Sequence, residues 1–406
     1  MENILKKHIL VISQYFYPEQ FRINDICSEW FKRGYRVTVV TGIPNYPKGK
    51  FYQGYGYLMK RREILNGIEI VRIPIVPRGK NSLMLMLNYL SFVISGYLWQ
   101  NFTKIKADLV FIFEVSPMTQ ALPGVWYAKK RNIPCHLYVQ DLWPENVVSI
   151  TGLTNKRVIG AIGKMVDYIY MNCSKIFTTS ESFVQSIHNR DVPLDKIHYW
   201  PQFAEDFYTP LKKFNESYIP IDSTFNVIFA GNIGNAQGLD ILPKAAEIIR
   251  NNYQCKVRFN IVGDGRYRNE LVNIVNQKGL SELFNFVPSQ EPTRIPELIA
   301  ASDAAFLSLT DSPLFSMTIP AKLQTYMACG IPIIAAASGE TEKILRNSNS
   351  GLCGKSGSAE ELALNLDILT KMSKTELKQL GFNARKYYEV HFSKKTLMDE
   401  MDRHLS

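Results

Sequence analysis

The sequence predicts an α/β protein with two doubly wound parallel-sheet domains in tandem, and three observations support this prediction. The chain has 406 residues, more than one hydrophobic core usually organises. Short apolar stretches alternate with helical ones from residue 8 to 200, and the same alternation starts again at residue 226. Residues 204–224, between the two series, are polar, contain two prolines and show no clear period, which predicts an interdomain linker.

The first series predicts an N-terminal, Rossmann-like domain over residues 1–203. Its apolar runs have the length and composition of parallel strands buried on both faces. The predicted strands are 8–13, 36–42, 68–74, 107–114, 134–140, 175–180 and 196–200. The first helix is expected to end near Arg33, because Gly34 suits the end of a helix. Residues 45–56, rich in Tyr, Pro, Gly and Lys, predict a long surface loop.

The second series predicts a C-terminal, Rossmann-like domain over residues 225–385. Its predicted strands are 226–230, 256–262, 284–287, 304–309 and 331–337. Helices are predicted at 240–251, from the end of GDGRYR (263–268) to Lys278, at 321–329, and from Ser358 onward. Strands and helices therefore alternate again, as in the first series.

The stretch from Thr318 to Glu340 reads as loop, helix, turn and strand. Thr318 is a plausible N-cap, and Pro320 suits the first helical turn because it lacks an N–H. Gly330 fits the left-handed position that ends a helix. Lys322 is a cation where the helix dipole already presents positive charge, which a bound phosphate would explain. A solvated surface lysine is the alternative, and this stretch alone leaves both open.

Charge and cysteine usage narrow the class of protein. Residues 1–200 carry 25 Lys and Arg against 14 Asp and Glu, whereas residues 201–406 carry 22 against 23. The basic first half therefore suits an anionic partner. An anionic membrane surface or a phosphorylated acceptor fits this charge as well as nucleic acid does, and no nucleic-acid module is recognisable, so nucleic acid is not predicted as a partner. The six cysteines are scattered without a CxxC, which favours a reducing compartment and no metal site. No signal peptide is recognisable at the N-terminus.

Residues 83–99 form the most apolar segment and contain no charge. A membrane-spanning helix needs about 20 apolar residues, and this run of 17 is interrupted by polar residues and a glycine. We therefore expect a mostly buried helix. Contact with a membrane surface is the second interpretation, since Arg78, Lys80, Lys104 and Lys106 flank the segment, and a true span is the third.

Three phosphate-compatible loops are predicted at one edge of the second sheet. The first is GNIGNAQG at 231–238, the second is GDG at 263–265 with Arg266 and Arg268 after it, and the third is the helix start with Lys322. Ligands bind beyond the carboxyl ends of such strands, so the three loops together indicate a phosphate site. GNIGNAQG is not GxGxxG, and the acidic residue that grips a ribose is missing, so a dinucleotide site is weakly supported.

In the first domain, polar residues follow the predicted strands at the matching edge. Asp141 ends a strand between apolar residues, and a carboxylate there would bind sugar hydroxyls or assist proton transfer. Glu19 and Glu145 are either functional or helix-start charges that meet the dipole. The same edge also offers Glu114 and the residues Arg22, Asn45 and Tyr46.

These motifs carry a family resemblance. The order and spacing of GNIGNAQG, VGDGRYR and YMACGIP resemble the donor half of the family 4 retaining glycosyltransferases, which have the GT-B fold. The likeness covers nearly the whole chain and includes NARKYYEVHFS, after which such enzymes have a last helix that crosses back to the first domain, here 386–406. YFYPE, IPNYP, QDLWPE and PAKLQTYMA most resemble the WbuB-type N-acetyl-L-fucosamine transferases, which build O-antigen and capsule repeat units.

The resemblance implies two domains that face a central cleft, with the sugar donor bound by the second domain and the acceptor by the first. Donor-binding residues are then Gly231, Asn232, Gly234, Gln237, Gly238, Gly265, Arg268, Thr318, Ile319, Pro320 and Thr325. Acceptor-side residues are Arg22, Asn45, Tyr46 and Glu145, and candidate catalytic residues are Asp141, Lys322 and Glu19.

The sequence departs from the general family pattern at four positions. The usual phosphate-binding Arg and Lys fall at Asn232 and Gln237, and the paired glutamates fall at Met317 and Thr325. A threonine would hold a nucleotide ribose less firmly than a glutamate does. The missing cations must be offset elsewhere, and Lys322 and Arg268 are the candidates.

The implied activity is transfer of an N-acetylated deoxyhexose from a UDP-sugar to a lipid-linked saccharide, with retention and without a metal or cofactor. The implied place is cytoplasmic, peripheral on the inner face of the cell membrane. A nucleotide-sugar 2-epimerase of the same fold and a degenerate, non-catalytic transferase scaffold are the alternatives. A dehydrogenase is disfavoured because the dinucleotide fingerprint is absent.

Overall fold

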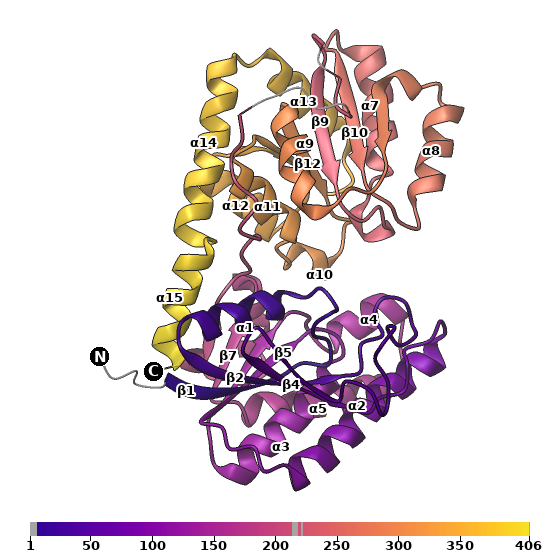
Figure 1. Cartoon of the computed structure of the whole chain (residues 1–406). Coiled ribbons are helices and arrows are strands. Elements are labelled where there is room, and N and C mark those ends of the chain that lie inside the picture. Colours follow the sequence, from indigo (N-terminus) through magenta and orange to yellow (C-terminus); the bar gives the residue numbers. More distant parts are fainter. Residues whose placement is uncertain (1–5, 213–217, 221, 406) are drawn as a thin grey trace. The chain divides into compact units, whose positions relative to one another are not determined.

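The computed structural model of the chain describes residues 6–212, 218–220 and 222–405 (Figure 1). The chain divides into two compact units, one of Met1–Trp200 with Met401–Ser406 and one of Pro201–Glu400. The predicted linker groups with the second unit, where Ile219 is buried, although its residues 213–217 and 221 lie outside the described part. Both units are parallel-sheet α/β domains, as the strand and helix alternation predicts.

The first unit is built on an eight-stranded sheet of order β3-β4-β2-β1-β5-β6-β7-β8. Its strands are β1 (Lys6–Ile12), β2 (Tyr35–Gly42), β3 (Arg62–Leu65), β4 (Ile68–Ile73), β5 (Leu109–Glu114), β6 (Cys135–Val139), β7 (Lys175–Thr178) and β8 (Ile197–Tyr199). All neighbours pair in parallel except β3, which forms an antiparallel hairpin with β4. The sequence analysis missed β3, because its short, alternating, charged run lacks the apolar signature of the central strands. The strand order reverses between β1 and β5, so ligands are expected at the carboxyl ends of these two strands.

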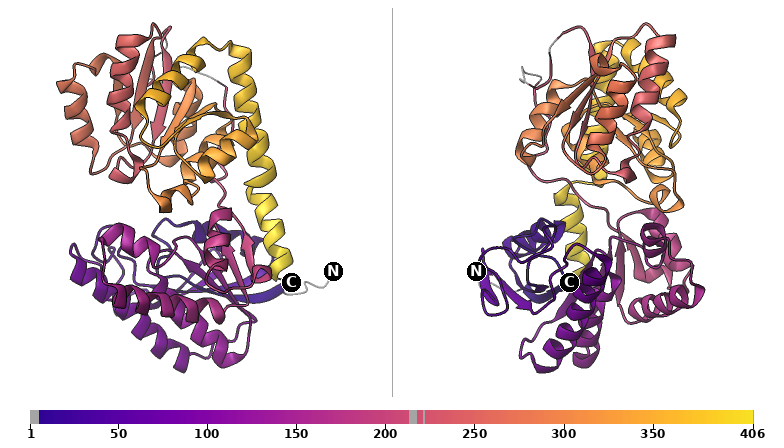
Figure 2. Two further views of the ribbon diagram at one scale, coloured as in Figure 1. Left: turned by 180° about the vertical axis from the view of Figure 1, so that it is seen from behind. Right: turned by 90° about the vertical axis from the view of Figure 1, so that its right-hand side faces the viewer.

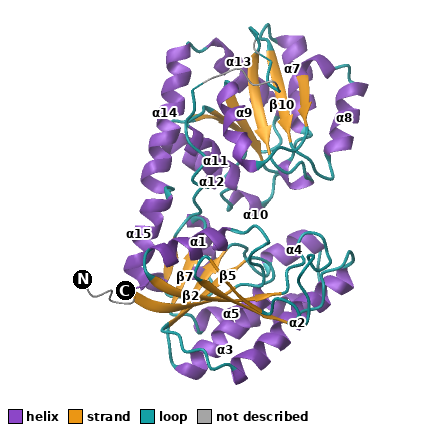
Figure 3. Ribbon diagram, viewed as in Figure 1, coloured by secondary structure: helices purple, strands orange, loops and turns teal. Residues whose placement is uncertain are grey.

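Helices cover both faces of the first sheet. They are α1 (Arg22–Lys32), α2 (Ser82–Phe102), α3 (Leu122–Arg131), α4 (Glu145–Thr151), α5 (Lys156–Met171) and α6 (Glu181–His188). Helix α1 lies on one face, and α2, α3 and α5 lie on the other (Figure 3). Residues Ile23, Ile26, Cys27 and Trp30 of α1 are buried, the i, i+3, i+4, i+7 stripe of a helix that packs on a sheet.

The prediction that residues 83–99 form a mostly buried helix is wrong. Helix α2 does form, but its outward face is apolar, and only Asn88, Phe92, Gly96 and Gln100 of the helix are buried. Asn88 donates its side-chain N–H to the carbonyl of Val76 at 2.6 Å, and the Ser95 hydroxyl donates to the carbonyl of Pro74 at 2.6 Å. These polar side chains point inward because they satisfy backbone carbonyls of the segment after β4, which leaves the apolar residues exposed.

The second unit has a six-stranded, all-parallel sheet of order β11-β10-β9-β12-β13-β14. Its strands are β9 (Phe225–Ala230), β10 (Val257–Val262), β11 (Phe284–Val287), β12 (Ala304–Ser308), β13 (Ile333–Ala336) and β14 (Gly351–Gly354). This is the doubly wound order in which the chain starts in the middle and reverses direction between β9 and β12. The loops after these two strands are therefore the expected ligand-binding edge.

The helices of the second unit complete a three-layer domain. They are α7 (Ile241–Asn252), α8 (Arg268–Gln277), α9 (Ile295–Ala301), α10 (Pro313–Ser316), α11 (Ala321–Cys329), α12 (Glu340–Ser348), α13 (Ala359–Lys371) and α14 (Lys374–His391). The long α14 runs along the second unit in both views of Figure 2. It begins with a capping box of Ser373 and Glu376, and its Arg385 donates to the carbonyl of Ala328 at the end of α11 at 2.6 Å.

Helix α15 (Lys394–Leu405) begins in the second unit, and its residues from Met401 group with the first. Within the first unit, the ring of His404 lies 4.4 Å from that of His198 and 5.1 Å from that of Phe177, measured between centroids. Lys175 Nζ donates to the carbonyl of His404 at 3.1 Å. The end of the chain therefore packs on β7 and β8 through uncharged imidazoles beside a lysine.

This contact predicts that the protein loses stability as the pH falls below 6.5. Burial, then His198, Lys175 and Arg403, lower the pKa of His404 from 6.5 to about 4. An unfolded chain binds the proton near 6.5 and the folded chain resists it, so the free energy of unfolding decreases between these values. Melting temperatures between pH 4 and 8 should show a flatter slope for His404→Gln than for the parent. Parallel curves for the two proteins would contradict this.

Candidate active site

Two glycine loops of the second domain pack backbone against backbone. A Cβ on Gly263 would lie 2.1 Å from the carbonyl oxygen of Gly231, and one on Gly265 would lie 2.2 Å from that of Ile233. Both glycines also have positive φ, of 136° and 156°. Any side chain at either position would therefore push the loops apart. The predicted loops 231–238 and 263–265 form one continuous surface.

The loop after β12 joins this surface. The N–H of Ile233 donates to the carbonyl of Asp264 at 2.8 Å, and the N–H of Thr310 donates to the carbonyl of Ala236 at 3.1 Å. Gly238, with φ of 57°, ends the short turn and packs against Thr310. The loops after β9, β10 and β12 thus meet at the point where the strand order reverses, the expected ligand edge of such a sheet.

Lys322 reaches this edge from helix α11. Its Nζ donates to Oε1 of Gln237 at 2.8 Å and lies 4.8 Å from the centroid of the Phe229 ring. A Cβ on Gly231 would lie 2.8 Å from Cε of Lys322, so the lysine stem lies across the glycine. Burial lowers the pKa of Lys322 to about 8. The side chain is half-buried and directed at the glycine loop, not into solvent.

Helix α11 begins differently from the prediction. The N-cap residue is Pro320, not Thr318, and the Thr318 hydroxyl donates to the carbonyl of Leu314 at 2.9 Å. Thr318 belongs to the turn that closes the preceding helix α10, since its N–H also donates to the carbonyl of Phe315 at 3.1 Å. The α11 start therefore keeps unused backbone N–H groups beside Lys322, which is what an anion site needs.

The remaining predicted donor residues lie at different depths. Asn232 is exposed, and its side-chain amide lies against Gly234 and Gly265, where added Cβ atoms would meet it at 2.9 and 2.8 Å. Ile319 is buried, and Thr325 is half-buried on α11. Arg268 is the first residue of α8, and its guanidinium lies 6.0 Å from the ring centroid of Phe286. Among the two predicted cations, Lys322 is thus the one in contact with the glycine loop.

Tyr326 is a residue that sequence reasoning missed. Its buried hydroxyl accepts a hydrogen bond from the backbone N–H of Ala230, at the end of β9, at 3.1 Å. The spacing in the sequence could have indicated this residue, because Tyr326 follows Lys322 by four residues and so lies on the same helix face. The pair fixes α11 against the start of the glycine loop.

In the first domain, Glu19 fastens two loops together. Its Oε1 accepts the backbone N–H groups of Asn45 and Tyr46 at 2.7 and 2.6 Å, and its Oε2 accepts that of Phe16 at 3.3 Å. Burial raises the pKa of Glu19 to about 7, although these N–H groups act in the opposite direction. Glu19 is therefore neither a helix-start charge nor an open catalytic carboxylate, because its oxygens are occupied by the loop at 45–46.

The loop held by Glu19 carries two of the predicted acceptor-side residues. Asn45 is buried, and its Oδ1 accepts the backbone N–H of Arg78 at 2.9 Å. Tyr46 is partly exposed and packs with Tyr15, whose ring centroid is 5.6 Å away. Arg22, in contrast, forms an ion pair with Asp25 within α1 at 2.9 Å. Asn45 and Tyr46 are thus brought together, whereas Arg22 is engaged within its own helix.

Asp141 lies just after the carboxyl end of β6, and a hydrogen bond orients its carboxylate. Its Oδ2 accepts the backbone N–H of Ser116 at 2.8 Å, and its own N–H points to Oε2 of Glu114 at 3.4 Å. Glu114 is fully buried, and burial, together with the nearby Asp141, raises its pKa well above the usual range. The buried Glu114 thus lies beside a half-buried Asp141. Glu145 is the first residue of α4.

The arrangement can bind an anion in the second domain and hydroxyl groups in the first. Amide groups and one cation converge on the glycine loops, and a positioned carboxylate and an amide lie at the matching edge of the first sheet. Within the described ranges, no group of three or more His, Cys, Asp and Glu side chains is placed to hold a metal ion.

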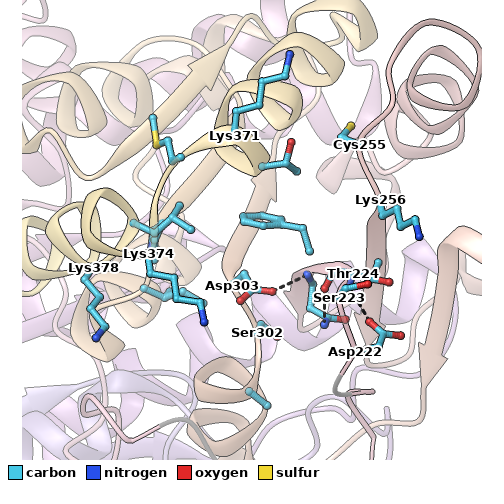
Figure 4. A pocket seen from close by; sticks show the side chains of 18 of the residues that line it. Asp222, Ser223, Thr224, Cys255, Lys256, Ser302, Asp303, Lys371, Lys374 and Lys378 are labelled. Atoms are coloured by element: carbon cyan, nitrogen blue, oxygen red, sulfur yellow. Dashed lines mark hydrogen bonds between the residues drawn. The ribbon is translucent and has the colours of Figure 1, made fainter.

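A large pocket lies elsewhere in the second domain (Figure 4). Its volume is about 1570 Å³, and it is lined by residues at the amino ends of the strands, including Phe225, Lys256 and Asp303. The glycine loops and Lys322 are not among its lining residues. Because ligands of such sheets bind at the carboxyl ends, the volume of this pocket does not mark the active site.

Comparison with known proteins identifies the class. Residues 21–205 match the model described as Glycosyltransferase Family 4, and residues 213–387 match the model described as Glycosyl transferases group 1. The chain therefore has a Glycosyltransferase Family 4 domain followed by a Glycosyl transferases group 1 domain, which supports a glycosyltransferase.

Individual relatives agree with this class. The chain is 25% identical over 357 residues to WcaI of Escherichia coli (strain K12), described as a colanic acid biosynthesis glycosyl transferase. This alignment covers 82% of this chain and 84% of the relative. It is 29% identical over 169 residues to a D-inositol 3-phosphate glycosyltransferase of Rhodococcus erythropolis, covering 40% of this chain and 37% of the relative. The relative that spans most of the chain is thus a polysaccharide-building transferase, and the WbuB-type branch is not singled out.

Solved structures share the fold. Sucrose-phosphate synthase from Thermosynechococcus elongatus aligns over 98% of this chain and 99% of its own, with a TM-score of 0.74 and 15% identity. Anabaena Alr3699/HepE in complex with UDP aligns over 98% and 99%, with a TM-score of 0.70 and 17% identity. WaaG, a lipopolysaccharide glycosyltransferase, aligns over 97% and 98%, with a TM-score of 0.63 and 14% identity. These neighbours establish the GT-B fold.

Proposed function

We propose that the protein is a retaining glycosyltransferase that moves a sugar from a UDP-sugar to a lipid-linked saccharide in O-antigen or capsule biosynthesis. The sugar is N-acetyl-L-fucosamine or a related N-acetylated deoxyhexose. The observation that carries the proposal is Lys322, held by Gln237 against the glycine loop where the strand order reverses. The likeness in fold to a protein solved with UDP, and in sequence to a colanic acid transferase, supports this choice.

The proposed chemistry depends on the leaving diphosphate. The glycine loops and the α11 start present backbone N–H groups to the phosphates, and Lys322 adds a positive charge. Retention would follow a front-face path without a protein nucleophile, as the family resemblance implies. Asp141, in the first domain, would bind or deprotonate a hydroxyl of the acceptor.

Ribose recognition is the part of the proposed site that differs from the family. Thr325, where the family has a glutamate, is half-buried on α11 and offers only a hydroxyl. We expect affinity for UDP to depend mainly on the diphosphate contacts. UDP should therefore bind much more tightly than uridine or UMP.

A thermal-shift panel of UDP, GDP, dTDP and ADP, followed by turnover of UDP-sugars, tests the proposal. UDP at a hundred times its dissociation constant should stabilise the full chain by about 2.7 kcal/mol. Release of UDP should depend on a lipid-linked acceptor. Sugar interconversion without UDP release would indicate an epimerase, and binding of no nucleotide by the folded protein would indicate a scaffold.

We further propose that the first domain rests on the inner face of the cytoplasmic membrane through α2. By length and composition α2 could cross a membrane, and only 17% of its most apolar 18-residue stretch is buried. Its outward side chains form an exposed apolar stripe: Leu83, Met86, Leu87, Leu90, Ile94, Tyr97, Leu98 and Phe102. Because α2 is hydrogen-bonded to the segment after β4 by its inward polar side chains, a helix lying on the surface fits better than a span.

Polar substitution of the stripe tests this placement. Changing Leu90, Ile94 and Leu98 to glutamine should weaken co-sedimentation with phospholipid vesicles by about tenfold or more, since apolar surface drives the contact. The matched control changes Leu364, Ile368 and Val390, exposed apolar residues of the second domain. Equal weakening by both triple variants would contradict a role for α2.

A further inference from the structure

Two short basic loops of the first domain are joined through their central glycines. Residues 48–50 read Lys-Gly-Lys, and residues 78–80 read Arg-Gly-Lys. The N–H of Gly79 donates to the carbonyl of Gly49 at 2.9 Å, and a Cβ on Gly49 would lie 2.4 Å from the carbonyl oxygen of Gly79. Both glycines have positive φ, of 73° and 60°. Only glycines allow this close pairing, which brings two basic tripeptides side by side.

The two tripeptides, here called the paired basic loops, carry four cations. Lys48, Lys50 and Lys80 are exposed and Arg78 is half-buried, and within the described part of the chain none forms an ion pair with a carboxylate. Arg78 is held in place, because its guanidinium donates to the Tyr15 hydroxyl at 3.2 Å and lies 5.2 Å from the ring centroid of Tyr46. Four positive charges without a counter-charge form a local site for an anion.

The paired basic loops adjoin the start of the apolar stripe on α2. A Cβ on Gly79 would lie 2.7 Å from Cβ of Met84, in the first turn of α2. Asn81 caps this helix by accepting the N–H of Met84 at 2.8 Å. The stripe begins with Leu83, which is 60% exposed. Positive charge and exposed apolar surface are therefore continuous, a combination that fits an amphiphile with an anionic group.

The paired basic loops are hydrogen-bonded to the predicted acceptor-side residues. The backbone N–H of Arg78 is bound by Asn45, and the backbone N–H of Asn45 is bound by Glu19. Asn45 is buried and positions this loop, so a saccharide at the partly exposed Tyr46 would lie next to an anion at Arg78 and a lipid chain at α2. This order of sugar, anion and lipid is the order of groups in a lipid-linked saccharide whose sugar is attached through a phosphate or diphosphate.

We propose that the paired basic loops bind the phosphate or diphosphate group of the lipid-linked acceptor. This proposal rests on the proposed function and adds to it the residues that hold the phosphate of the acceptor. The cations contact the phosphate oxygens, the stripe on α2 contacts the lipid, and the sugar extends toward Tyr46. The loops thereby set the distance between the membrane and the reacting sugar.

Vesicle binding by the full chain tests the proposal. Phosphatidylcholine vesicles carry a polyprenyl diphosphate, a polyprenyl monophosphate or phosphatidylglycerol, at equal total negative charge. The parent should bind the phosphorylated polyprenyl vesicles at least about tenfold more tightly than the phosphatidylglycerol vesicles. A variant with glutamine at Lys48, Lys50, Arg78 and Lys80 should lose this preference. Equal binding of the parent to all three vesicles would overturn the proposal in favour of general attraction to lipid headgroups.

A matched control removes the same charge elsewhere. Lys256, Lys374, Lys378 and Lys386 are exposed lysines of the second domain, and their replacement by glutamine should change polyprenyl diphosphate binding by less than about twofold. An equal loss in this variant would also overturn the proposal. UDP binding and melting temperature, measured on the same proteins, report folding. A parent that binds UDP but shows no preference refutes the acceptor site alone, whereas one that binds no UDP refutes the proposed function.

Discussion

Replacing Lys322 by methionine is expected to lower kcat by about a hundredfold or more, the scale of one lost electrostatic contact in a preorganised site. A leaving diphosphate gains negative charge as the glycosidic bond breaks, so a nearby cation stabilises the transition state more than the ground state. Methionine keeps most of the apolar stem that lies across Gly231 and over the Phe229 ring, and removes the charge. Initial rates of UDP release with saturating donor and acceptor measure the effect.

The pH dependence gives an independent measurement of the same residue. Burial lowers the pKa of Lys322 to about 8, so the free enzyme loses this charge as the pH rises through that value. We expect kcat/KM to fall by about tenfold per pH unit on the alkaline side, because this ratio reports ionisation of the free enzyme. In Lys322→Arg the charge persists, so the alkaline decrease should disappear even if the rate is lower.

A surface lysine would behave differently in both measurements. If Lys322→Met retained turnover within a few-fold of the parent and its alkaline limb were unchanged, the charge of Lys322 would have no role in catalysis. The melting temperature serves as the folding control. Because Lys322 is half-buried, removing its charge should not itself destabilise the domain.

The parallel strands and the glycine loops could be predicted because they depend on local chemistry. Buried parallel strands are apolar throughout, and Gly263 and Gly265 occupy positions where any side chain would meet the backbone of the neighbouring loop. Such requirements can be recognised from single residues of the sequence. The edge strands β3 and β14, in contrast, were missed because each has only four residues and is only partly buried.

The orientation of α2 could not be predicted because composition does not say which face of a helix is buried. Asn88 and Ser95 appeared to interrupt an apolar helix, yet they face inward and bind backbone carbonyls of the segment after β4. Their partners are distant residues whose unmet hydrogen bonds are visible only in the folded chain. The sequence signal was therefore correct about the helix and wrong about its environment.

Glu19 and Thr318 illustrate a similar limit in the candidate site. A glutamate after a strand and a threonine before a helix each have a common local role, and the sequence supports that role. In the structure Glu19 binds the backbone of the loop at 45–46, and Thr318 closes the turn after α10. Hydrogen bonds to a loop distant in sequence determine the role of Glu19, whereas a bond to a residue only four positions earlier determines that of Thr318. The Lys322 side chain contacts the glycine loop through Gln237, and its role toward a phosphate stays a prediction.

Replacing Asp141 by asparagine is expected to lower kcat by about a hundredfold to ten-thousandfold, the range for loss of a general acid or base. Asparagine keeps an oxygen that can accept the N–H of Ser116, as Oδ2 of Asp141 does at 2.8 Å, so the loop after β6 should keep its geometry. Only the ability to take a proton from the acceptor hydroxyl is lost. The affinity for UDP, which depends on the second domain, should stay within about twofold of the parent.

Glu114→Gln is the matched control for this substitution. Burial raises the pKa of Glu114 well above its usual range and so favours the uncharged carboxyl, which a glutamine resembles in shape. The control should therefore retain turnover within a few-fold, whereas Asp141→Asn should not. Single-turnover rates with a UDP-sugar and a lipid-linked acceptor separate chemistry from product release. If Asp141→Asn turned over as fast as Glu114→Gln, the carboxylate at the end of β6 would only shape the loop, and the proton acceptor would have to be sought among other groups of the site.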